Sequence, residues 1–350
     1  MTRPVTTIAL LALSGVAAHL AEWAGLPLPF LIGPLLASAA VATALPHRLP
    51  AGYAFPPTLR LVFIAVIGLM IGAQVTPELF SNAPRLALSF AALLLFTVLA
   101  HAIGYAVYAR IGGYDRVTAF YAAAPGGLFE SIAMGDEAGA DPARLMLQQF
   151  LRVIVVVTLL PIGLSIWLGE PVGSSAGMTL ARADVPWQAL PVIVLAGAAG
   201  IAAGHVLRLP ARQLTGPLAI AAALNLTGVW HIDIPEWLLH VAQVVVGCAL
   251  GMRFTGLSRA MLLRGFGLTI LSVGGILILS GLFAVALMGP IGQPFDVMLI
   301  SFAPGGVTEM ALVALSLQAN PALVTLHHIF RILITVMGLG LTARWIRKGL

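Results

Sequence analysis

The chain has 350 residues, of which 60% are hydrophobic and 9% are charged, with 18 basic and 13 acidic side chains and a formal net charge of +5. About a quarter of the residues in a soluble globular domain are charged, so this composition argues against a soluble enzyme, a nucleic-acid-binding module and a disordered protein. We expect instead an all-α polytopic membrane protein, whose lipid-facing surface needs few charges.

Twelve apolar segments follow one another along the chain, and a spanning helix needs roughly 20 such residues. They cover 5–22, 27–45, 57–77, 83–110, 116–139, 143–169, 186–207, 211–230, 236–254, 262–289, 295–318 and 321–345. Pro125-Gly126-Gly127 interrupts the fifth segment, and Pro304-Gly305-Gly306 interrupts the eleventh. The long polar stretch 170–185 predicts a linker between two membrane repeats, 1–169 and 186–350.

The two halves are copies of one another. Residues 124–152 align without a gap on residues 303–331, at an offset of 179, and ten of the 29 positions are identical. The same offset pairs the glycines of Gly68-x-x-x-Gly72 with those of Gly247-x-x-x-Gly251, while an offset of 183 pairs the Gly-Pro-Leu runs at 33–35 and 216–218. We conclude that the gene segment was duplicated in tandem.

The distribution of Lys and Arg indicates how the halves are oriented, because cytoplasmic loops hold most of these residues. If the two interrupted segments cross the bilayer, the halves are parallel and the count is nine inside and seven outside. If they enter and return as hairpins, the halves are inverted and the count is fourteen inside and two outside, Arg85 and Arg182. We therefore predict two inverted repeats, about ten spanning helices, two re-entrant hairpins with Pro-Gly-Gly tips, and cytoplasmic termini.

The two Pro-Gly-Gly tips are the first candidate binding elements. Irregular backbone inside a membrane is tolerated where protein or water surrounds it. Proline removes a donor and glycine permits close approach to a ligand, and the exposed half-helix ends suit ions. We expect the tips to meet near the midplane and bind substrate. A plain proline kink is the alternative.

Four charged residues follow the tips in equivalent places. Glu130 and Glu309 lie five residues after the proline of each tip. Arg152 and Arg331 lie ten residues after Pro142 and Pro321. Ten residues of helix rise about 15 Å, half the hydrocarbon thickness, so these charges are expected near the membrane centre. Such charges are functional candidates: the arginines for an anionic substrate, the glutamates for a proton or cation. The alternative is a structural ion pair that locks each hairpin.

Polar residues at similar depth are candidates for a pathway, although each also suits a helix-to-helix hydrogen bond. They are Ser131, Thr308, Gln148 and His327, with Gln149 and His328 beside them. The two Gly-x-x-x-Gly runs predict close-packing faces instead.

Enzyme motifs are missing from the sequence. It contains no His-Glu zinc motif, P-loop, nucleophile elbow or dinucleotide fingerprint. The single cysteine, Cys248, lies in an apolar run and excludes a disulfide within the chain. We expect no enzymatic activity, no cofactor, no metal site and no binding of nucleic acid.

The paired stretches APGGLFESIAMGDEAGAD and APGGVTEMALVALSLQAN, each followed by an arginine, resemble the AbrB family of bacterial membrane proteins, and the resemblance covers essentially the whole chain. Labels in this family imply regulation of gene expression or ammonia monooxygenase activity. The layout is also similar to that of cation/proton antiporters and anion symporters, whose re-entrant tips are glycine-rich.

These observations predict a secondary transporter of a small anionic metabolite, coupled to H⁺ or Na⁺, in the bacterial cytoplasmic (inner) membrane. Its partners would be the lipid bilayer, the substrate and the coupling ion, and the layout is compatible with a homodimer. A membrane-embedded sensor that regulates gene expression through a partner is the alternative, and a membrane monooxygenase ranks last.

The inverted arrangement can be tested with cysteines placed singly at Asp115 and Asp296, in a background without Cys248. Since inverted repeats put these positions on opposite sides of the membrane, a membrane-impermeant thiol reagent should label one from outside and the other only after the cells are opened. Labelling of both from the same side would rule out the inverted arrangement.

Overall fold

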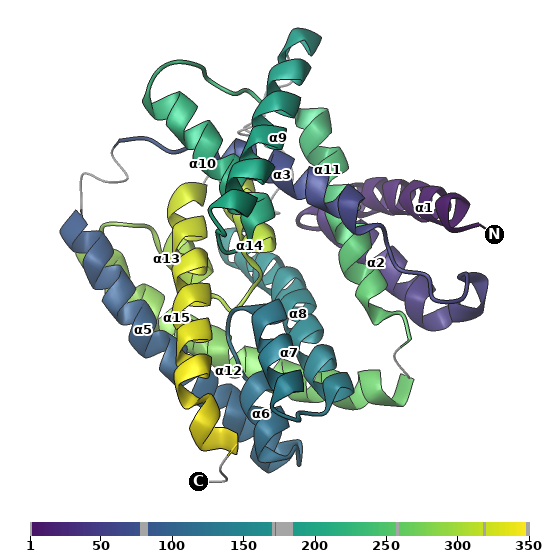
Figure 1. Ribbon diagram of the computed structural model, residues 1–350, viewed down its shortest axis with the longest axis vertical. Helices are drawn as coiled ribbons and strands as arrows, with labels where there is room; N and C mark the ends of the chain where they lie inside the picture. The colour runs from purple at the N-terminus through teal and green to yellow at the C-terminus, as the bar shows by residue number, and fades with distance from the viewer. Residues whose placement is uncertain are drawn as a thin grey trace. The chain divides into compact units, whose positions relative to one another are not determined.

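The structure is a computed structural model that describes residues 2–77, 83–169, 172, 185–256, 259–317 and 320–347. The elements in this part of the chain are helices (Figure 1). The α-helices are α1 Arg3–Trp23, α2 Pro29–Ala44, α3 Pro57–Ala73, α5 Ala83–Ala106, α6 Arg116–Ala122, α7 Leu128–Glu137, α8 Pro142–Leu168, α9 Leu190–Val206, α10 Arg212–Leu226, α11 Glu236–Gly251, α12 Arg259–Ile291, α13 Phe295–Phe302, α14 Val307–Ser316 and α15 Pro321–Arg347. Single short turns also occur: η1 Pro46–Arg48, η2 Val107–Ile111, η3 Trp187–Ala189 and η4 Met252–Phe254.

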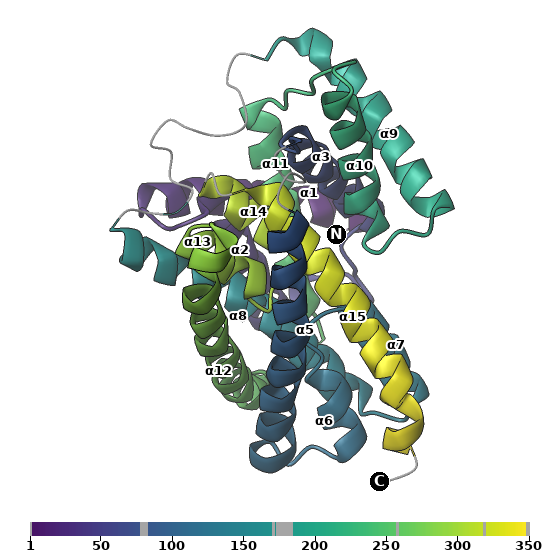
Figure 2. The ribbon, with the colours of Figure 1, turned by 90° about the vertical axis from the view of Figure 1, so that its left-hand side faces the viewer.

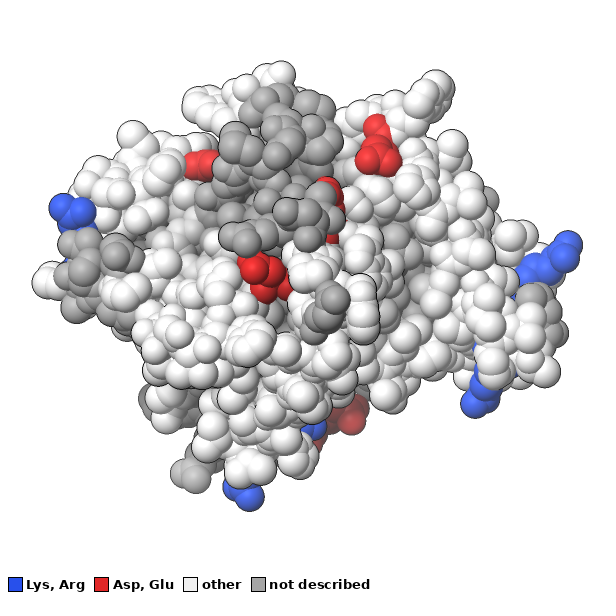
Figure 3. Space-filling model, turned by 90° about the horizontal axis from the view of Figure 1, so that it is seen from above, with Lys and Arg blue, Asp and Glu red and all other residues white. Residues whose placement is uncertain are grey.

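The all-helical fold and the multi-pass character predicted from composition are confirmed. In the described ranges, six helices are long and apolar enough to cross a bilayer: Arg3–Trp23, Pro84–Ile111, Pro142–Leu168, Glu236–Phe254, Ala260–Ile291 and Pro321–Thr342. The face seen in Figure 3 agrees, because its few charged side chains stand in isolated patches on a largely uncharged surface. Nearly all of the predicted linker 170–185 lies outside the described residues, and the inverted orientation stays a prediction.

The chain divides into two compact units, and each draws on both halves of the sequence. Unit 1 comprises Met1–Ser81, Leu160–Leu257 and Ala311–Ala322. Unit 2 comprises Asn82–Leu159, Ser258–Met310 and Leu323–Leu350. Unit 1 thus holds the first three helices of each half, and unit 2 holds both tips. The predicted repeats at 1–169 and 186–350 describe the sequence, whereas the compact units cut across them.

Unit 1 is organised by backbone contacts at glycines. Helices α2 and α11 pack together, as do α3 and α10, and the latter pair lies beside α9 in Figure 2. A Cβ atom at Gly68 or Gly72 would collide with carbonyl oxygens of α10, and one at Gly247 or Gly251 with carbonyl oxygens of α2. Small residues let helix backbones approach closely. Each Gly-x-x-x-Gly run is therefore a packing face between the two halves. The run in α3 packs against α10, and the run in α11 packs against α2.

Unit 2 holds α5 and α12 side by side and a hairpin formed by α6 and α7. The main-chain N–H of Asp141, just beyond α7, donates to the Thr118 hydroxyl at the start of α6 (2.8 Å). The chain therefore enters along α6, turns at Pro125 and returns along α7 to its starting level. At seven and ten residues, or roughly 10 and 15 Å, neither helix could span a bilayer alone.

Replacement of Gly72 or Gly251 by alanine should lower the stability of the protein by about 1–3 kcal/mol, because the added methyl group overpacks a helix pair. The matched control is Gly274→Ala in α12, where a Cβ atom meets nothing within 4 Å; this change should be neutral or mildly stabilising. Melting temperatures in detergent measure both. Equal melting of all three variants would contradict the proposed packing.

Candidate functional site

The two Pro-Gly-Gly tips are breaks between half-helices, and both are buried in the structure. Helix α6 ends at Ala122 and α7 begins at Leu128, while α13 ends at Phe302 and α14 begins at Val307. We call residues 123–127 tip 1 and residues 303–306 tip 2. Gly127 has a φ of 63°, in the left-handed region that favours glycine. The predicted interruptions are thus real breaks rather than kinks in continuous helices.

The two arginines that the sequence predicts at mid-membrane depth donate hydrogen bonds to carbonyl groups at these breaks, where the helical hydrogen bonds stop. Arg152 on α8 donates from Nη1 to the Ala124 carbonyl, and Arg331 on α15 donates from Nη1 to the Ala303 carbonyl. Ala124 and Ala303 are equivalent at the offset of 179, so both halves use the same bond. Arg331 also donates from Nη2 to the Gly305 carbonyl (2.8 Å). Unsatisfied helix-end carbonyls inside a membrane cost several kcal/mol each, and the guanidiniums remove that cost.

A second pair of side chains, one turn earlier on α8 and α15, also bonds to main-chain carbonyl groups that precede the tips. Gln149 donates from Nε2 to the Tyr121 carbonyl (2.9 Å), and His328 bonds through Nε2 to the Ile300 carbonyl (3.0 Å), its equivalent. Arg331 Nη2 lies 2.7 Å from His328 Nδ1. Because arginine can only donate, Nδ1 accepts and the His328 proton resides on Nε2. His328 therefore supports Arg331 as well as the main chain.

The arginines have no carboxylate partners among the described residues. Both are buried, with 4% of Arg152 and 1% of Arg331 exposed, and no ion pair joins either of them to Glu130 or Glu309. Each Nε is buried without a hydrogen-bond partner. The contacts of the described residues therefore include no structural ion pair between these arginines and either hairpin. The carbonyl groups orient the guanidiniums but leave their positive charge uncompensated.

The two glutamates differ in their surroundings although both are the third residue of a half-helix. Glu309 is buried, with 5% exposed, and its carboxylate folds back over Gly306, where any side chain would collide with it. Glu130 is exposed. Glu309 is the one buried carboxylate in the described chain, so it is the stronger candidate for binding a proton or a cation.

Three of the predicted pathway residues make hydrogen bonds within unit 2. Ser131 donates to the Gly127 carbonyl (2.5 Å) and so belongs to the first turn of α7. Gln148 accepts from Thr269 on α12 (2.7 Å), and His327 bonds to Ser89 on α5 (2.6 Å). Gln148 and His327 thus tie α8 to α12 and α15 to α5. Thr308 is buried beside Glu309.

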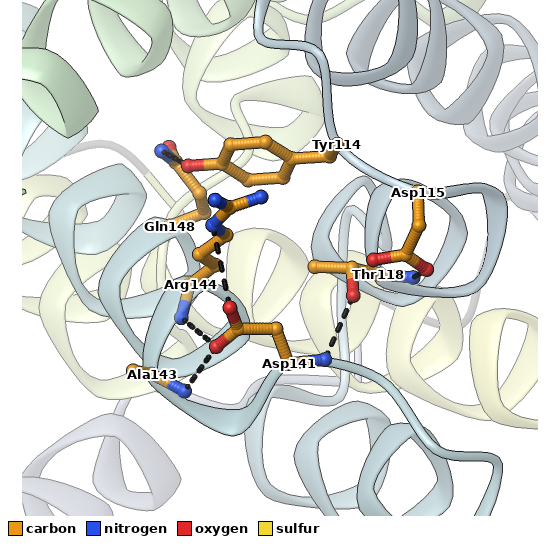
Figure 4. A network of polar contacts seen from close by, with 7 residues as sticks. All are labelled: Tyr114, Asp115, Thr118, Asp141, Ala143, Arg144 and Gln148. Atoms are coloured by element: carbon orange, nitrogen blue, oxygen red, sulfur yellow. Dashed lines mark hydrogen bonds and ion pairs between the residues drawn. The ribbon is translucent and has the colours of Figure 1, made fainter.

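A polar cluster closes the open end of the α6–α7 hairpin (Figure 4). Asp115 accepts from the Thr118 N–H (2.9 Å) and begins α6, while Asp141 accepts from two N–H groups at the start of α8 and pairs with Arg144 (3.3 Å). Burial raises the pKa of Asp115, but hydrogen bonds from Thr118 and main-chain groups outweigh it and leave the pKa below its ordinary value. These capping bonds hold the ends of the hairpin, and hence tip 1, in place.

Sequence reasoning missed two residues beside tip 1, His101 and Thr335. Both line a cavity next to Pro125. The signal for His101 was a histidine inside an apolar segment, which is uncommon in membrane helices. No signal marked Thr335, because one threonine in a spanning helix is ordinary.

Comparison with known proteins extends over both tips and both arginines. The family model described as "Transition state regulatory protein AbrB" matches residues 30–347. "Putative regulator AbrB" of Escherichia coli (strain K12) is 27% identical over 322 residues, 90% of this chain and 87% of that protein. "Uncharacterized protein YhjN" of Bacillus subtilis (strain 168) is 29% identical over 262 residues, 70% of this chain and 67% of that protein.

The support that His328 gives to tip 2 predicts which substitutions the protein tolerates. His328→Gln should melt close to the wild type, because an amide can donate to Ile300 and accept from Arg331. His328→Leu should cost about 1–3 kcal/mol, since it leaves buried polar groups unpaired. Thermal unfolding in detergent compares the two. Equal destabilisation by Gln and Leu would show that the ring's shape, rather than its hydrogen bonds, matters.

Proposed function

We propose that this chain, which belongs to the AbrB family, is a secondary transporter that carries a small anionic metabolite and couples it to H⁺ or Na⁺. The observation that carries the proposal is the pair of buried guanidiniums, Arg152 and Arg331, which face carbonyl groups rather than carboxylates. A charge buried near the centre of a membrane protein is costly unless an opposite charge joins it. A substrate anion would supply that charge.

The half-helices add to this preference for an anion. Helices α7 and α14 both begin immediately after a tip, at Leu128 and Val307. The first N–H groups of a helix have no partner within the helix, and the helix dipole makes that end positive. Helix starts therefore bind anions, and here each one directly follows a segment that a buried arginine holds.

The two arginines differ in how many of their N–H donors already bond to the protein. Arg331 makes hydrogen bonds to three carbonyl groups and to His328, so most of its donors are occupied. Among the residues that the structure describes, Arg152 makes one hydrogen bond to protein, to Ala124. A guanidinium has five N–H donors in a planar fork. Arg152 is therefore the ligand for the substrate anion, and Arg331 fixes tip 2.

Glu309 supplies the coupling in this proposal. A buried carboxylate is stable only when it is protonated or paired with a cation. Its place at the first turn after tip 2 puts its charge beside the segment that binds substrate. Uptake of H⁺ or Na⁺ at Glu309 would offset part of the negative charge that the substrate brings. Glu130, being exposed, serves as the secondary site.

The division into two units suits alternating access. Transporters with duplicated halves move one bundle against another around a site at the broken helices. Unit 2 gathers both tips, both arginines and Glu309, while unit 1 gathers the first three helices of each half. In this proposal unit 2 carries the substrate, and the protein lies in the bacterial cytoplasmic membrane with both termini in the cytoplasm, as a monomer or homodimer.

A regulatory role is the second candidate, favoured by the names of the matching family model and of the Escherichia coli relative. Such a role would use the same anion site as a sensor and would need a partner to reach the gene. Transport measured in pure lipid vesicles separates the two candidates, because a sensor binds its ligand without moving it.

Proteoliposomes containing the purified protein should take up one class of radiolabelled anion from a panel of mono-, di- and tricarboxylates, phosphate and sulfate. An inward H⁺ or Na⁺ gradient should accelerate this uptake. Arg152→Gln should abolish it, because the ligand for the anion is lost. Arg110→Gln, which removes an exposed arginine of unit 2, is the matched control and should transport normally. Uptake that is equal in the Arg152 and Arg110 variants would contradict the proposal.

A further inference from the structure

Five of the six tryptophans in the chain belong to unit 1, and all five are exposed at the ends of helices. Trp23 is the last residue of α1, Trp167 the last but one of α8, and Trp237 the second of α11. Trp187 begins η3 just before α9, and Trp230 follows α10. Their exposed fractions run from 54% for Trp237 to 87% for Trp23. Tryptophans at the ends of spanning helices are typical of the membrane–water interface.

Ring and main-chain contacts bring several of these helix ends together. The His19 ring of α1 meets the Phe30 ring of α2 edge-on at 5.3 Å, and the His240 ring of α11 stacks on Phe30 at 3.9 Å. The main-chain N–H of Leu28, just before α2, donates to the carbonyl of Val172, just beyond α8 (2.9 Å). The ends of α1 and α8 therefore lie beside the starts of α2 and α11.

Helices α9 and α10 extend the same end of unit 1. A Cβ atom at Gly200 would collide with Pro217 and one at Gly204 with Arg212, so the two helices run antiparallel. The start of α9 and the end of α10 thus lie together, and the Trp230 N–H donates to the last turn of α10. The connection 227–235 leads from there to the start of α11. All five tryptophans share one end of unit 1, which we call the tryptophan end.

Charged residues are sorted between the two ends of unit 1. Glu22, Asp233 and Glu236, the carboxylates that the structure describes in this unit, lie at the tryptophan end. The described arginines lie at the other ends of the helices, at the starts of α1, α3 and α10 or after α2, α9 and α11: Arg3, Arg48, Arg60, Arg208, Arg212 and Arg253. Helix α1 runs from an arginine to a tryptophan, and its 21 residues rise about 30 Å, the thickness of the hydrocarbon core.

We propose that the tryptophan end of unit 1 is an anchoring surface that binds the headgroup layer of the outer leaflet. An indole has an apolar body and one N–H donor, so it is most stable where acyl chains meet headgroups. Arginines near the ends of spanning helices mark the cytoplasmic side, which puts the tryptophan end on the outside. The distance of one hydrocarbon core between the two ends fits a lipid interface rather than another protein chain.

A one-sided anchor distinguishes the two units. Lifting the indoles out of the interface would expose their rings to water or bury their N–H groups, so unit 1 is held at a constant depth. No described side chain of unit 2 is a tryptophan. Unit 1 is then the stationary part against which unit 2 moves. This inference about movement rests on the proposed transport function, whereas the anchor does not.

The depth of the tryptophans can be measured in bilayers of phosphatidylcholine brominated either near the glycerol end or near the methyl end of its acyl chains. In full-length variants, one of the five tryptophans is kept and the others, with Trp345, become phenylalanine. Each retained tryptophan should lose more fluorescence to the shallow bromines. The matched reference is Leu13→Trp, at an exposed position midway along α1, in a chain whose native tryptophans are all phenylalanine; it should lose more to the deep bromines.

The wild-type chain should also prefer the shallow bromines, which guards against variants that misfold. Greater loss to the deep bromines would overturn the proposal, because the indoles would then lie in the core. Loss to neither lipid would overturn it as well, since a second copy of the chain or another protein would then cover the indoles.

The side of the membrane is tested with Glu22→Cys and Arg48→Cys, one at each end of unit 1, in a background without Cys248. A membrane-impermeant thiol reagent should label Glu22→Cys on intact cells and Arg48→Cys only after the cells are opened. The reverse pattern, or labelling of both from one side, would contradict an anchor in the outer leaflet. Neither measurement involves a substrate, so the anchor and the transport function can fail separately.

Discussion

Main chain that leaves the helical conformation inside a bilayer must find hydrogen-bond partners within the protein, and in this chain two buried arginines are those partners. Arg152 and Arg331 donate to the carbonyl groups of Ala124 and Ala303, immediately before the two prolines. An aliphatic side chain in either place would leave the carbonyl groups bare, and a lysine would offer a single point of charge instead of a fork. The fixed carbonyl groups and the buried positive charge both follow from this one choice of side chain, and the proposed binding of an anion rests on it.

The sequence pattern that occurs in both halves is matched by a structural scheme that also occurs twice, although the two occurrences differ in their side chains. Helices α7 and α14 are both ten residues long, and α8 and α15 are both 27 residues long. Within this shared frame, the position that Gln149 occupies on α8 is held on α15 by His328, which adds a bond to Arg331. Arg331 uses both of its Nη groups in hydrogen bonds, whereas the hydrogen bond of Arg152 in the described part of the chain uses Nη1 alone. A cavity lined by Thr97 and Phe120 lies beside tip 1, whereas Ile276 and Leu299, 179 positions further along the chain, pack in a buried apolar cluster.

Sequence reasoning predicted the features that depend directly on residue type and on the spacing between residues. Apolar length located the helices, Pro-Gly-Gly located both breaks, and the register of Arg152 and Arg331 placed them beside the tips. The contacts that were missed involve main chain or distant segments. Carbonyl groups carry no signature in a sequence, so the partners considered for the arginines were a substrate anion or, as the alternative, Glu130 and Glu309.

The features that the sequence did not predict depend on tertiary packing. It buries Glu309 and exposes Glu130, although both stand at the same position of a half-helix. It also assembles each compact unit from both halves, and it forms a cavity from His101 and Thr335, which lie on α5 and α15. None of these outcomes follows from local periodicity, because each depends on which helices become neighbours.

The central claim concerns charge rather than the shape of a substrate, so the simplest anion tests it most directly. Crystals of the protein grown in bromide should show an anomalous peak within hydrogen-bond distance of the Arg152 guanidinium, and crystals of Arg152→Gln should lack that peak. Bromide bound only at exposed arginines such as Arg144, with none beside Arg152, would show that the carbonyl groups alone satisfy the buried charge and would contradict the account.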